Sequence, residues 1–208
     1  MSSHPAAARV IALYNRHVDV WENNRHSRLP EGEQYWIDRF IQLLPATNEV
    51  LDLGCGTGLP IARFLGDHGL TVMGIDGSEQ MISRFRLHNP APTALVADMR
   101  TLALAGKWSG IIAWCSLFHL PPMDQRRMFP VFSEHTIAGA PLLFNTGPYA
   151  GESIGEFEGE PLYHASLSTE EYELLLDRHG FDVIYHVVED PDCFGYTVWL
   201  AVKRDEKI

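Results

Sequence analysis

Hydrophobic positions along the chain change period near residue 50, and this change divides the sequence into two kinds of structure. Before it, apolar residues recur at helical spacing, which predicts a helix over 5–25 and a second over 33–44 that Pro45 stops. After it, short apolar runs alternate with helical stretches. The runs cover 50–53, 71–75, 94–97, 110–115 and 142–145, and the helices between them cover 59–68, 78–88 and 124–136. This alternation predicts βαβ units, and hence a mainly parallel sheet with helices on both faces.

The end of the chain breaks the alternation. After a predicted helix over 168–179, the strand-like runs 181–188 and 196–202 are joined by a link too short for a crossover helix. They predict an antiparallel hairpin at the sheet edge. The expected fold is therefore α/β, a Rossmann-like doubly wound sheet of seven strands. It is mainly parallel, with an antiparallel C-terminal hairpin strand, and N-terminal helices cover it as a lid.

Charge and cysteine content narrow the possible partners. The 208 residues hold 27 Asp and Glu against 16 Lys and Arg, and a net charge of −11 repels a phosphate backbone, so nucleic acid is not expected as a partner. The cysteines at 55, 115 and 193 form no CxxC pair. They predict neither a metal site nor a disulfide framework, and a cytoplasmic, reducing setting is expected. No apolar run approaches the roughly 20 residues that span a bilayer, so no membrane association is expected.

The most informative segment follows the first apolar run and reads Val50-Leu-Asp-Leu-Gly-Cys-Gly-Thr-Gly-Leu-Pro60. A buried strand there ends in three alternate glycines, which let a ligand approach the backbone and leave N–H groups aimed at an anion. A dinucleotide fingerprint would need Gly or Ala at position 59, where this chain has leucine. Asp52 would also repel a pyrophosphate. A ligand with an ammonium and a carboxylate fits better, since Asp52 can bind the first and the glycine N–H groups the second.

This segment resembles the first motif of class I S-adenosylmethionine-dependent methyltransferases, and matching features continue to about Val202. Five parallel strands followed by a hairpin are also the layout of that class. The resemblance implies S-adenosyl-L-methionine as the cofactor. It assigns Asp52, Gly54 and Gly56 to the site.

Two later strand ends extend the resemblance. The segment 74–81 resembles the family's ribose-binding acidic loop, in which Asp76 accepts hydrogen bonds from the cis-diol and Gly77 follows it. Met81 either lies against the adenine face or packs in the core. The segment 97–100 resembles the adenine motif, which implies that the Asp98 carboxylate accepts from the exocyclic amine and the Met99 N–H donates to the ring. The alternative for Asp98 is a helix cap.

The end of the fourth strand is expected to reach the methyl group. It reads Trp114-Cys-Ser-Leu117, and the Asn/Asp-Pro-Pro-Tyr motif often found in enzymes that methylate amide or nucleobase nitrogens is absent from it. The following Phe-His-Leu-Pro resembles small-molecule members related to methyltransferase families 11 and 25. His119 is therefore the first candidate for a general base, since the unperturbed pKa of histidine is about 6.5. The alternative is that His119 packs against the loop or caps the next helix. Cys115 is expected to offer its backbone carbonyl to the cofactor, and Trp114 to lie in the core or in the pocket wall.

Two further segments are expected to enclose the pocket. Residues 14–25 resemble the lead helix of small-molecule methyltransferases, which folds over the cofactor, and Tyr14, Trp21 and Arg25 are spaced to share one face. In that analogy Arg25 approaches the methionine carboxylate. The alternative is an amphipathic helix with buried aromatic residues and a solvated arginine. The second enclosing segment is the Gly-rich, acidic stretch 147–164, in which Tyr163 and His164 are candidates for contact with the acceptor. Its glutamates either favour a cationic acceptor or are solvated.

We therefore expect a single methyltransferase domain over 1–208, with helical lid 1–45, cofactor-binding core 46–146, substrate loop 147–167, and a final helix and hairpin over 168–208. The expected partner is a small-molecule acceptor, and the chain is expected to be a monomer or homodimer. Three other activities remain open. They are a dinucleotide-dependent oxidoreductase, which the glycine spacing and the lack of a Tyr-x-x-x-Lys pair disfavour, aminopropyl transfer from decarboxylated cofactor, and a non-catalytic S-adenosylmethionine-binding regulator.

Overall fold

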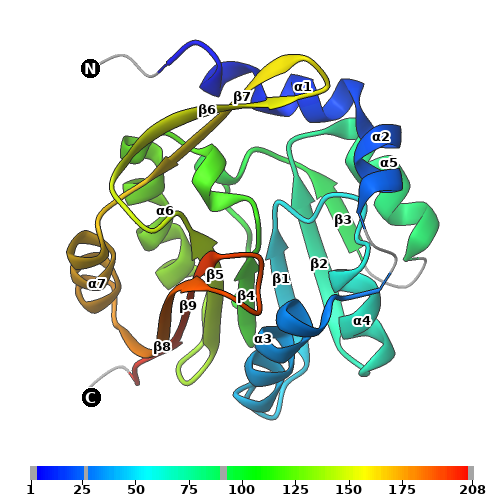
Figure 1. Ribbon diagram of the computed structural model, residues 1–208. Coiled ribbons are helices and arrows are strands. Elements are labelled where there is room, and N and C mark those ends of the chain that lie inside the picture. Colours follow the sequence, from blue (N-terminus) through cyan, green and yellow to red (C-terminus); the bar gives the residue numbers. More distant parts are fainter. Residues whose placement is uncertain (1–3, 26–27, 90–92, 206–208) are drawn as a thin grey trace.

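A seven-stranded sheet forms the centre of the computed structural model, which describes residues 4–25, 28–89 and 93–205 (Figure 1). The strand order is β3-β2-β1-β4-β5-β9-β8. The first five strands pair in parallel, and β9 pairs antiparallel with both β5 and β8. The predicted α/β fold with its C-terminal hairpin is therefore confirmed. The strands are β1 (Glu49–Leu53), β2 (Thr71–Asp76), β3 (Thr93–Val96), β4 (Gly110–Ala113), β5 (Pro141–Thr146), β8 (Phe181–Asp190) and β9 (Tyr196–Lys203).

Helices cover both faces of this sheet. Helices α3 (Glu31–Gln42), α4 (Ile61–Asp67) and α5 (Glu79–His88) pack in one hydrophobic cluster, and α6 (Pro122–Glu134) and α7 (Thr169–Arg178) pack in the other. Neighbouring residues of a strand point to opposite faces, so Val50 of β1 enters the first cluster and Leu51 the second. Both faces are thus occupied by core, which leaves the carboxyl ends of the parallel strands as the place for a site.

Helix boundaries differ slightly from the sequence prediction. Helix α6 begins at Pro122, two residues earlier than expected, because a proline suits the first helical turn, where no N–H partner is needed. Helix α5 begins directly after Ser78, whose side chain accepts a hydrogen bond from the Met81 N–H and so caps the helix. Helix α3 ends at Gln42, ahead of Pro45.

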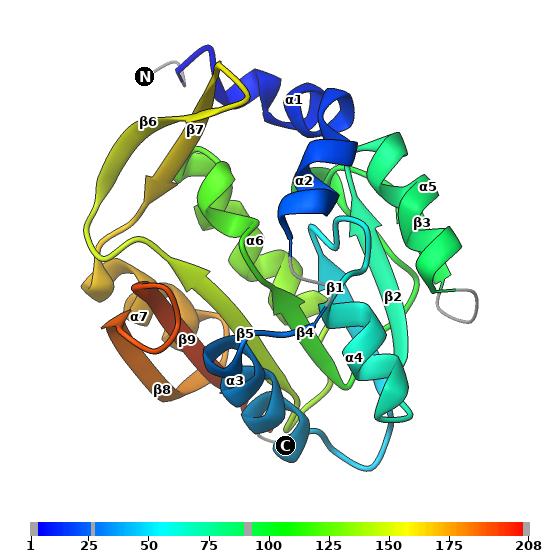
Figure 2. The ribbon, with the colours of Figure 1, turned by 45° about the vertical axis from the view of Figure 1, so that its right-hand side comes forward.

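The single helix predicted over 5–25 is wrong. The chain forms a 3-10 turn, η1 (Ala7–Arg9), then α1 (Val10–Arg16) and α2 (Val18–Asn24). His17 separates the two helices with φ −109° and ψ 25°, outside the helical region. Helix α2 therefore turns from α1 toward the sheet, and Tyr14 and Trp21 lie on different helices (Figure 2).

The predicted substrate loop 147–167 is also corrected, because most of it is a second, two-stranded sheet. Strands β6 (Gly151–Phe157) and β7 (Glu160–Ser166) form an antiparallel hairpin. Glu158 and Gly159 turn it with positive φ of 53° and 74°, as a two-residue hairpin turn requires. The hairpin packs against the N-terminal segment through Leu13 and Leu162. Helices α1 and α2 and this hairpin, together the roof, lie over the carboxyl ends of the parallel strands (Figures 1 and 2).

Parts of the predicted domain 1–208 lie outside the described residues, namely 1–3, 26–27, 90–92 and 206–208. None of the helices in the described ranges has the length and apolar character that a membrane span needs.

Candidate functional site

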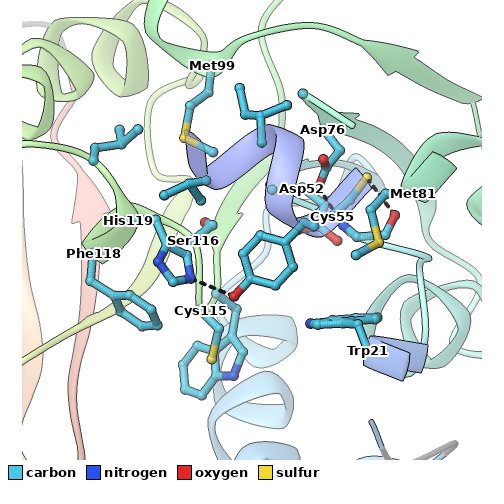
Figure 3. Close-up of a pocket in the computed structure, with 18 of the residues that line it drawn as sticks. Trp21, Asp52, Cys55, Asp76, Met81, Met99, Cys115, Ser116, Phe118 and His119 are labelled. Carbon is cyan, nitrogen blue, oxygen red and sulfur yellow. Dashed lines mark hydrogen bonds between the residues drawn. The ribbon is translucent and has the colours of Figure 1, made fainter. Parts of the chain in front are cut away.

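A cavity of about 350 Å³ lies between the roof and the ends of the parallel strands. Ligand pockets commonly measure about 300–1,000 Å³, so the space suits a small molecule. Figure 3 shows two halves. Carboxylates Asp52 and Asp76 lie on one side near Trp21, and Phe118 and His119 lie on the other. Fourteen of the predicted site residues line this cavity: Tyr14, Trp21, Arg25, Asp52, Gly54, Gly56, Asp76, Gly77, Met81, Asp98, Met99, Cys115, His119 and His164.

The glycine loop after β1 contributes its backbone conformation to the site, because its N–H groups are hydrogen-bonded within the protein. Gly54 and Gly56 have φ of 77° and 54°, a conformation that side-chain-bearing residues rarely adopt. The N–H groups of Gly54 and Cys55 both donate to the Ile75 carbonyl, at 2.7 and 3.0 Å. The Gly56 N–H donates to Oδ2 of Asp76 at 3.0 Å. The expectation that these N–H groups bind a ligand carboxylate is therefore wrong, because the protein itself already uses them.

The buried carboxylate of Asp52 lacks a hydrogen-bond donor among the described residues. Its side chain lies at the end of β1, only 2% of the residue is exposed, and no donor within the described part of the chain hydrogen-bonds to it. Burial, and then the nearby Asp76, raise the pKa of Asp52 to about 7. Buried polar groups nearly always have a partner. This carboxylate is therefore well suited to a cationic group of a ligand in the cavity.

Asp76 is held in place by the backbone. Its two carboxylate oxygens accept hydrogen bonds from the N–H groups of Gly56, at 3.0 Å, and Ser78, at 2.8 Å. Burial raises the pKa of Asp76, and these two hydrogen bonds oppose the rise. Each carboxylate oxygen has a second lone pair, so Asp76 can still accept from hydroxyl groups of a ligand.

Asp98 follows β3 and behaves as the cap that the sequence left as an alternative. Its side chain accepts from the Arg100 N–H at 3.0 Å and from the Arg100 guanidinium at 2.5 to 3.0 Å. Arg100 thereby lowers the pKa of Asp98. Asp98 and Met99 both line the cavity. Met81, at 2% exposure, combines the two predicted roles, since it packs in the core and also borders the cavity.

Arg25 follows α2 and is paired with Glu33 of α3. Nη1 and Nη2 of Arg25 donate to the two oxygens of Glu33 at 3.0 and 2.6 Å. Glu33 is fully buried and also accepts from the Trp114 indole N–H at 3.2 Å. The solvated alternative for Arg25 is therefore wrong. Trp114 is 4% exposed and lines the cavity, so it belongs to both the core and the pocket wall.

Cys115 lies at the end of β4 in a constrained turn. Its φ is 51°, and its N–H donates to Oδ1 of the buried Asn145 at 2.7 Å. The Asn145 amide N–H also contacts the Cys115 sulfur at 3.5 Å. Burial raises the pKa of the Cys115 thiol, so the thiol is un-ionised and a poor nucleophile. Asn145 thus fixes a strained backbone beside the cavity.

His119 joins the roof to the strand ends. Its Nε2 lies 3.0 Å from the Tyr14 hydroxyl, and its Nδ1 lies 2.9 Å from the Tyr163 carbonyl oxygen. Burial lowers the pKa of His119 to about 4, so the ring is neutral near pH 7. Both ring nitrogens are engaged within the protein. His119 is therefore in the cavity wall, as expected, but it is a weaker base than an ordinary histidine.

The two candidates on β7 point in different directions. His164 lines the cavity, and its ring centroid lies 4.8 Å from that of His119. The Tyr163 side chain is fully buried in the cluster with Leu13 and is absent from the described cavity wall. Successive residues of a strand face opposite sides, so only one of the pair can face the ligand. The prediction that Tyr163 contacts the acceptor is therefore wrong, although its backbone carbonyl holds His119.

Sequence reasoning did not single out several residues of the site, and Asn15 and Tyr196 are two of them. Asn15 of α1 accepts from the Ser78 hydroxyl at 2.9 Å and from the Gln80 N–H at 3.1 Å, which fastens the roof beside Asp76. Tyr196, at the start of β9, lines the cavity. No local pattern marks either residue, because their partners are far away in the sequence.

Residues 50–137 match a family model described as "Methyltransferase domain". This region is similar to methyltransferases, and the seven-stranded fold of the whole chain is that of the class I members. The matched residues contain β1 to α6, and so the three strand ends that carry Asp52, Asp76 and Asp98.

Several known proteins are similar to this chain. O-methyltransferase cnsE of Penicillium expansum is 26% identical over 209 residues, which cover 88% of this chain and 75% of that protein. The CcbJ methyltransferase of Streptomyces caelestis has a TM-score of 0.73 at 18% identity, covering 93% of this chain and 98% of CcbJ. CalS10, an aminopentose methyltransferase of Micromonospora echinaspora, has a TM-score of 0.70 at 17% identity, covering 90% and 96%. At 17–18% identity, the TM-scores of these two structures support the fold alone.

Proposed function

We propose that this chain transfers a methyl group from S-adenosylmethionine to a small-molecule acceptor, by in-line displacement that leaves S-adenosylhomocysteine. The observation that carries the placement of the cofactor is the buried carboxylate of Asp52, which has no donor among the described residues and lies close to Asp76. An ammonium and a ribose diol are the cofactor groups that suit these two carboxylates.

The polar half of the cavity offers a partner for each remaining group of the cofactor. Arg25 keeps N–H groups beyond the two that bind Glu33, and these can bind the methionine carboxylate. Asp98 and Met99 border the space proposed for adenine, with Met81 as an apolar wall. Gly54, Gly56 and Gly77 permit close approach of the ligand, and Cys115 offers a carbonyl. Bound S-adenosylmethionine supplies an electrophilic methyl carbon and a neutral thioether leaving group.

The aromatic half is the proposed place of the acceptor. Phe118, His119 and His164 line it, and the Tyr14 hydroxyl lies 3.0 Å from Nε2 of His119. The names of two similar proteins, CalS10 and a dTDP-amino-sugar N,N-dimethyltransferase of Streptomyces venezuelae, describe small-molecule acceptors. The second is 33% identical over 72 residues, which are 35% of this chain and 30% of that protein.

The glutamates of the hairpin lend no support to a cationic acceptor. Glu152 and Glu156 of β6 are exposed, and neither lines the cavity within the described residues. Glu160 of β7 accepts from Arg16 and contacts His17 at 2.9 Å, so it joins the hairpin to α1. These carboxylates are therefore either exposed to solvent or used to join the hairpin to α1.

We propose that the roof shields the reacting groups from water and closes over bound ligand. The roof is hydrogen-bonded to the start of α5 through Asn15 and to His119 after β4, which supports a single domain for the whole chain. We also propose a cytoplasmic location, for which the support is that Cys55, Cys115 and Cys193 are all free thiols. A monomer or a homodimer is consistent with this proposal.

A non-catalytic regulator is the main competing function. The continuation of the cavity from Asp52 and Asp76 to Phe118 and His119 favours an enzyme, because a pure cofactor sensor needs no room for an acceptor (Figure 3). The test has two steps. Thermal shift with S-adenosylmethionine, S-adenosylhomocysteine and NAD is expected to show stabilisation by the first two only, worth about 2.7 kcal/mol at a ligand concentration of about 100 Kd.

A metabolite library is then screened for acceptor-dependent release of S-adenosylhomocysteine. Turnover with at least one small molecule is expected. A larger thermal shift with NAD would contradict the cofactor assignment. Cofactor binding without turnover of any library member would favour the regulator.

A further inference from the structure

Three groups form a directed chain of hydrogen bonds from the hairpin into the cavity. The Tyr163 carbonyl oxygen lies 2.9 Å from Nδ1 of His119, and Nε2 of His119 lies 3.0 Å from the Tyr14 hydroxyl. A carbonyl only accepts, so Nδ1 carries the hydrogen. In a neutral ring Nε2 then has a lone pair and no hydrogen. The Tyr14 hydroxyl is therefore the donor to Nε2, and the direction of the whole chain is fixed by a backbone carbonyl of β7.

This direction decides what Tyr14 can offer to an acceptor. A phenol has one hydroxyl hydrogen, and Tyr14 donates this hydrogen to His119. The Tyr14 oxygen therefore presents only lone pairs to the cavity. Burial raises the pKa of Tyr14, which keeps the phenol protonated. A nucleophile that meets this oxygen must therefore itself carry a hydrogen to donate. Tertiary amines and thioethers have none.

The same chain lacks a strong base. Both nitrogens of His119 are occupied, and burial lowers its pKa to about 4, so the ring does not hold a proton near neutral pH. An alcohol or phenol becomes a good nucleophile only by losing its proton. A neutral amine already has a free electron pair and can attack while it keeps its hydrogen.

The walls of the aromatic half select the neutral form of an amine. Phe118, Leu120 and His164 line this half, and burial lowers the pKa of His164, which leaves it uncharged as well. Two of the lining carboxylates, Asp52 and Asp76, lie in the other half in Figure 3, and the third, Asp98, is paired with Arg100. An ammonium ion has no electron pair for attack, and an uncharged, desolvated chamber disfavours it.

We propose that the acceptor is a primary or secondary amine whose N–H donates to the Tyr14 oxygen, which aims the nitrogen electron pair at the methyl carbon. This inference rests on the proposed function. As the N–C bond forms, the C–S bond breaks and its electron pair stays on sulfur. The proton stays on nitrogen and passes to water after release. Tyr14 is thus a specificity residue, and His119 is a positioning residue that acts through it.

Nitrogen-15 NMR of histidine-labelled protein tests the direction of the chain without an acceptor. The His119 ring is expected to be the Nδ1–H tautomer at pH 7 and to remain neutral down to about pH 5. In Tyr14→Phe the Nε2 resonance is expected to shift, because its donor is lost, whereas Tyr35→Phe on the exposed surface of α3 leaves it unchanged. An Nε2–H tautomer or a charged ring at pH 7 would overturn the inference.

Substrate analogues test its consequence. Every acceptor found in the library screen is compared with its tertiary-amine and alcohol analogues, and only N–H-bearing members are expected to release S-adenosylhomocysteine. Tyr14→Phe is expected to lower kcat/KM for the amine at least tenfold while the Kd of the cofactor stays within twofold. Turnover of a tertiary amine, a thioether or an alcohol would refute the amine assignment and leave methyl transfer itself intact. An absence of turnover with every compound would instead count against the proposed function, and the NMR result alone would then decide the hydrogen-bond chain.

Discussion

Arg25 and Glu33 form an ion pair that ties the end of the roof to the helix beneath it. Two hydrogen bonds of 3.0 and 2.6 Å join the guanidinium to the carboxylate, and the carboxylate is fully buried. Glu33 also holds the indole of Trp114 at the end of β4. One buried side chain thus positions both a proposed cofactor ligand and the pocket wall.

Glu33→Ala is expected to lower the free energy of unfolding by about 3 kcal/mol, because it leaves the Arg25 charge and the Trp114 N–H without their acceptor. The value is at the low end for buried pairs, since the Arg25 side chain is 20% exposed. Urea denaturation measures it. The control is Glu31→Ala, an exposed position of the same helix, for which the loss should stay below about 1 kcal/mol. Equal losses in the two variants would mean that the pair is not structurally important.

Asp76→Ala is expected to raise the Kd for S-adenosylmethionine by about 10- to 100-fold, since hydrogen bonds to a charged group contribute about 1.5–3 kcal/mol each. The effect should exceed that of Asp98→Ala, whose carboxylate is already paired with Arg100. Calorimetry measures both. Asp67→Ala, on the exposed side of α4, is the matched control and should leave the Kd unchanged. An unchanged Kd for Asp76→Ala would mean that Asp76 only organises its own loop.

Cofactor affinity is expected to rise with pH up to about 7. Asp52 is largely protonated in the free protein below its pKa of about 7. Binding of an ammonium favours the ionised carboxylate, so binding releases a proton and the affinity gains up to about tenfold per pH unit below that pKa. The α-amino group has a pKa of about 7.7, so it is almost fully protonated at pH 5.5 and 6.5, where the slope is read, and begins to lose its proton only near pH 7.5.

Calorimetry at pH 5.5, 6.5 and 7.5 checks this pH dependence. Asp52→Asn should bind more weakly at pH 7.5 and lose the slope, because its amide cannot ionise. The folding stability of the free wild-type protein changes with pH in the opposite direction from the cofactor affinity. The raised pKa of Asp52 makes a stabilising contribution at low pH that is lost as the pH rises through about 7. A wild-type Kd that does not change with pH would place the ammonium elsewhere.

The roof is expected to become more protected from hydrogen exchange when cofactor and acceptor bind. Helices α1 and α2 and the hairpin β6–β7 border the cavity, and closure would order them around the ligand. Exchange mass spectrometry measures this. Helix α7, on the opposite side of the core from α3, is the internal control and should show no ligand-dependent change. Equal exchange of the roof with and without ligand would identify it as a fixed brace.

The order and spacing of apolar segments in the sequence were sufficient to predict the sheet and the positions of its functional strand ends. Parallel strands bring their carboxyl ends to one edge, so Asp52, Asp76 and Asp98, each at or just after such an end, had to meet near one cavity. Alternating apolar runs and a short link predicted the terminal hairpin correctly. These features could be predicted because each depends on neighbouring residues and on the order of the strands.

Contacts between side chains of distant elements could be known only from the folded chain. Tyr14 and His119 are 105 positions apart, and no local period predicts their contact. A strand exchanges its two faces with a shift of one residue, so the sequence could not choose between Tyr163, which packs in the core, and His164, which faces the cavity. The N–H groups of Gly54 and Gly56 were likewise expected to be available, but the structure places the Ile75 carbonyl against the first and the Asp76 carboxylate against the second. Local sequence fixes the element and its period, but facing and hydrogen-bond partners depend on packing across the whole fold.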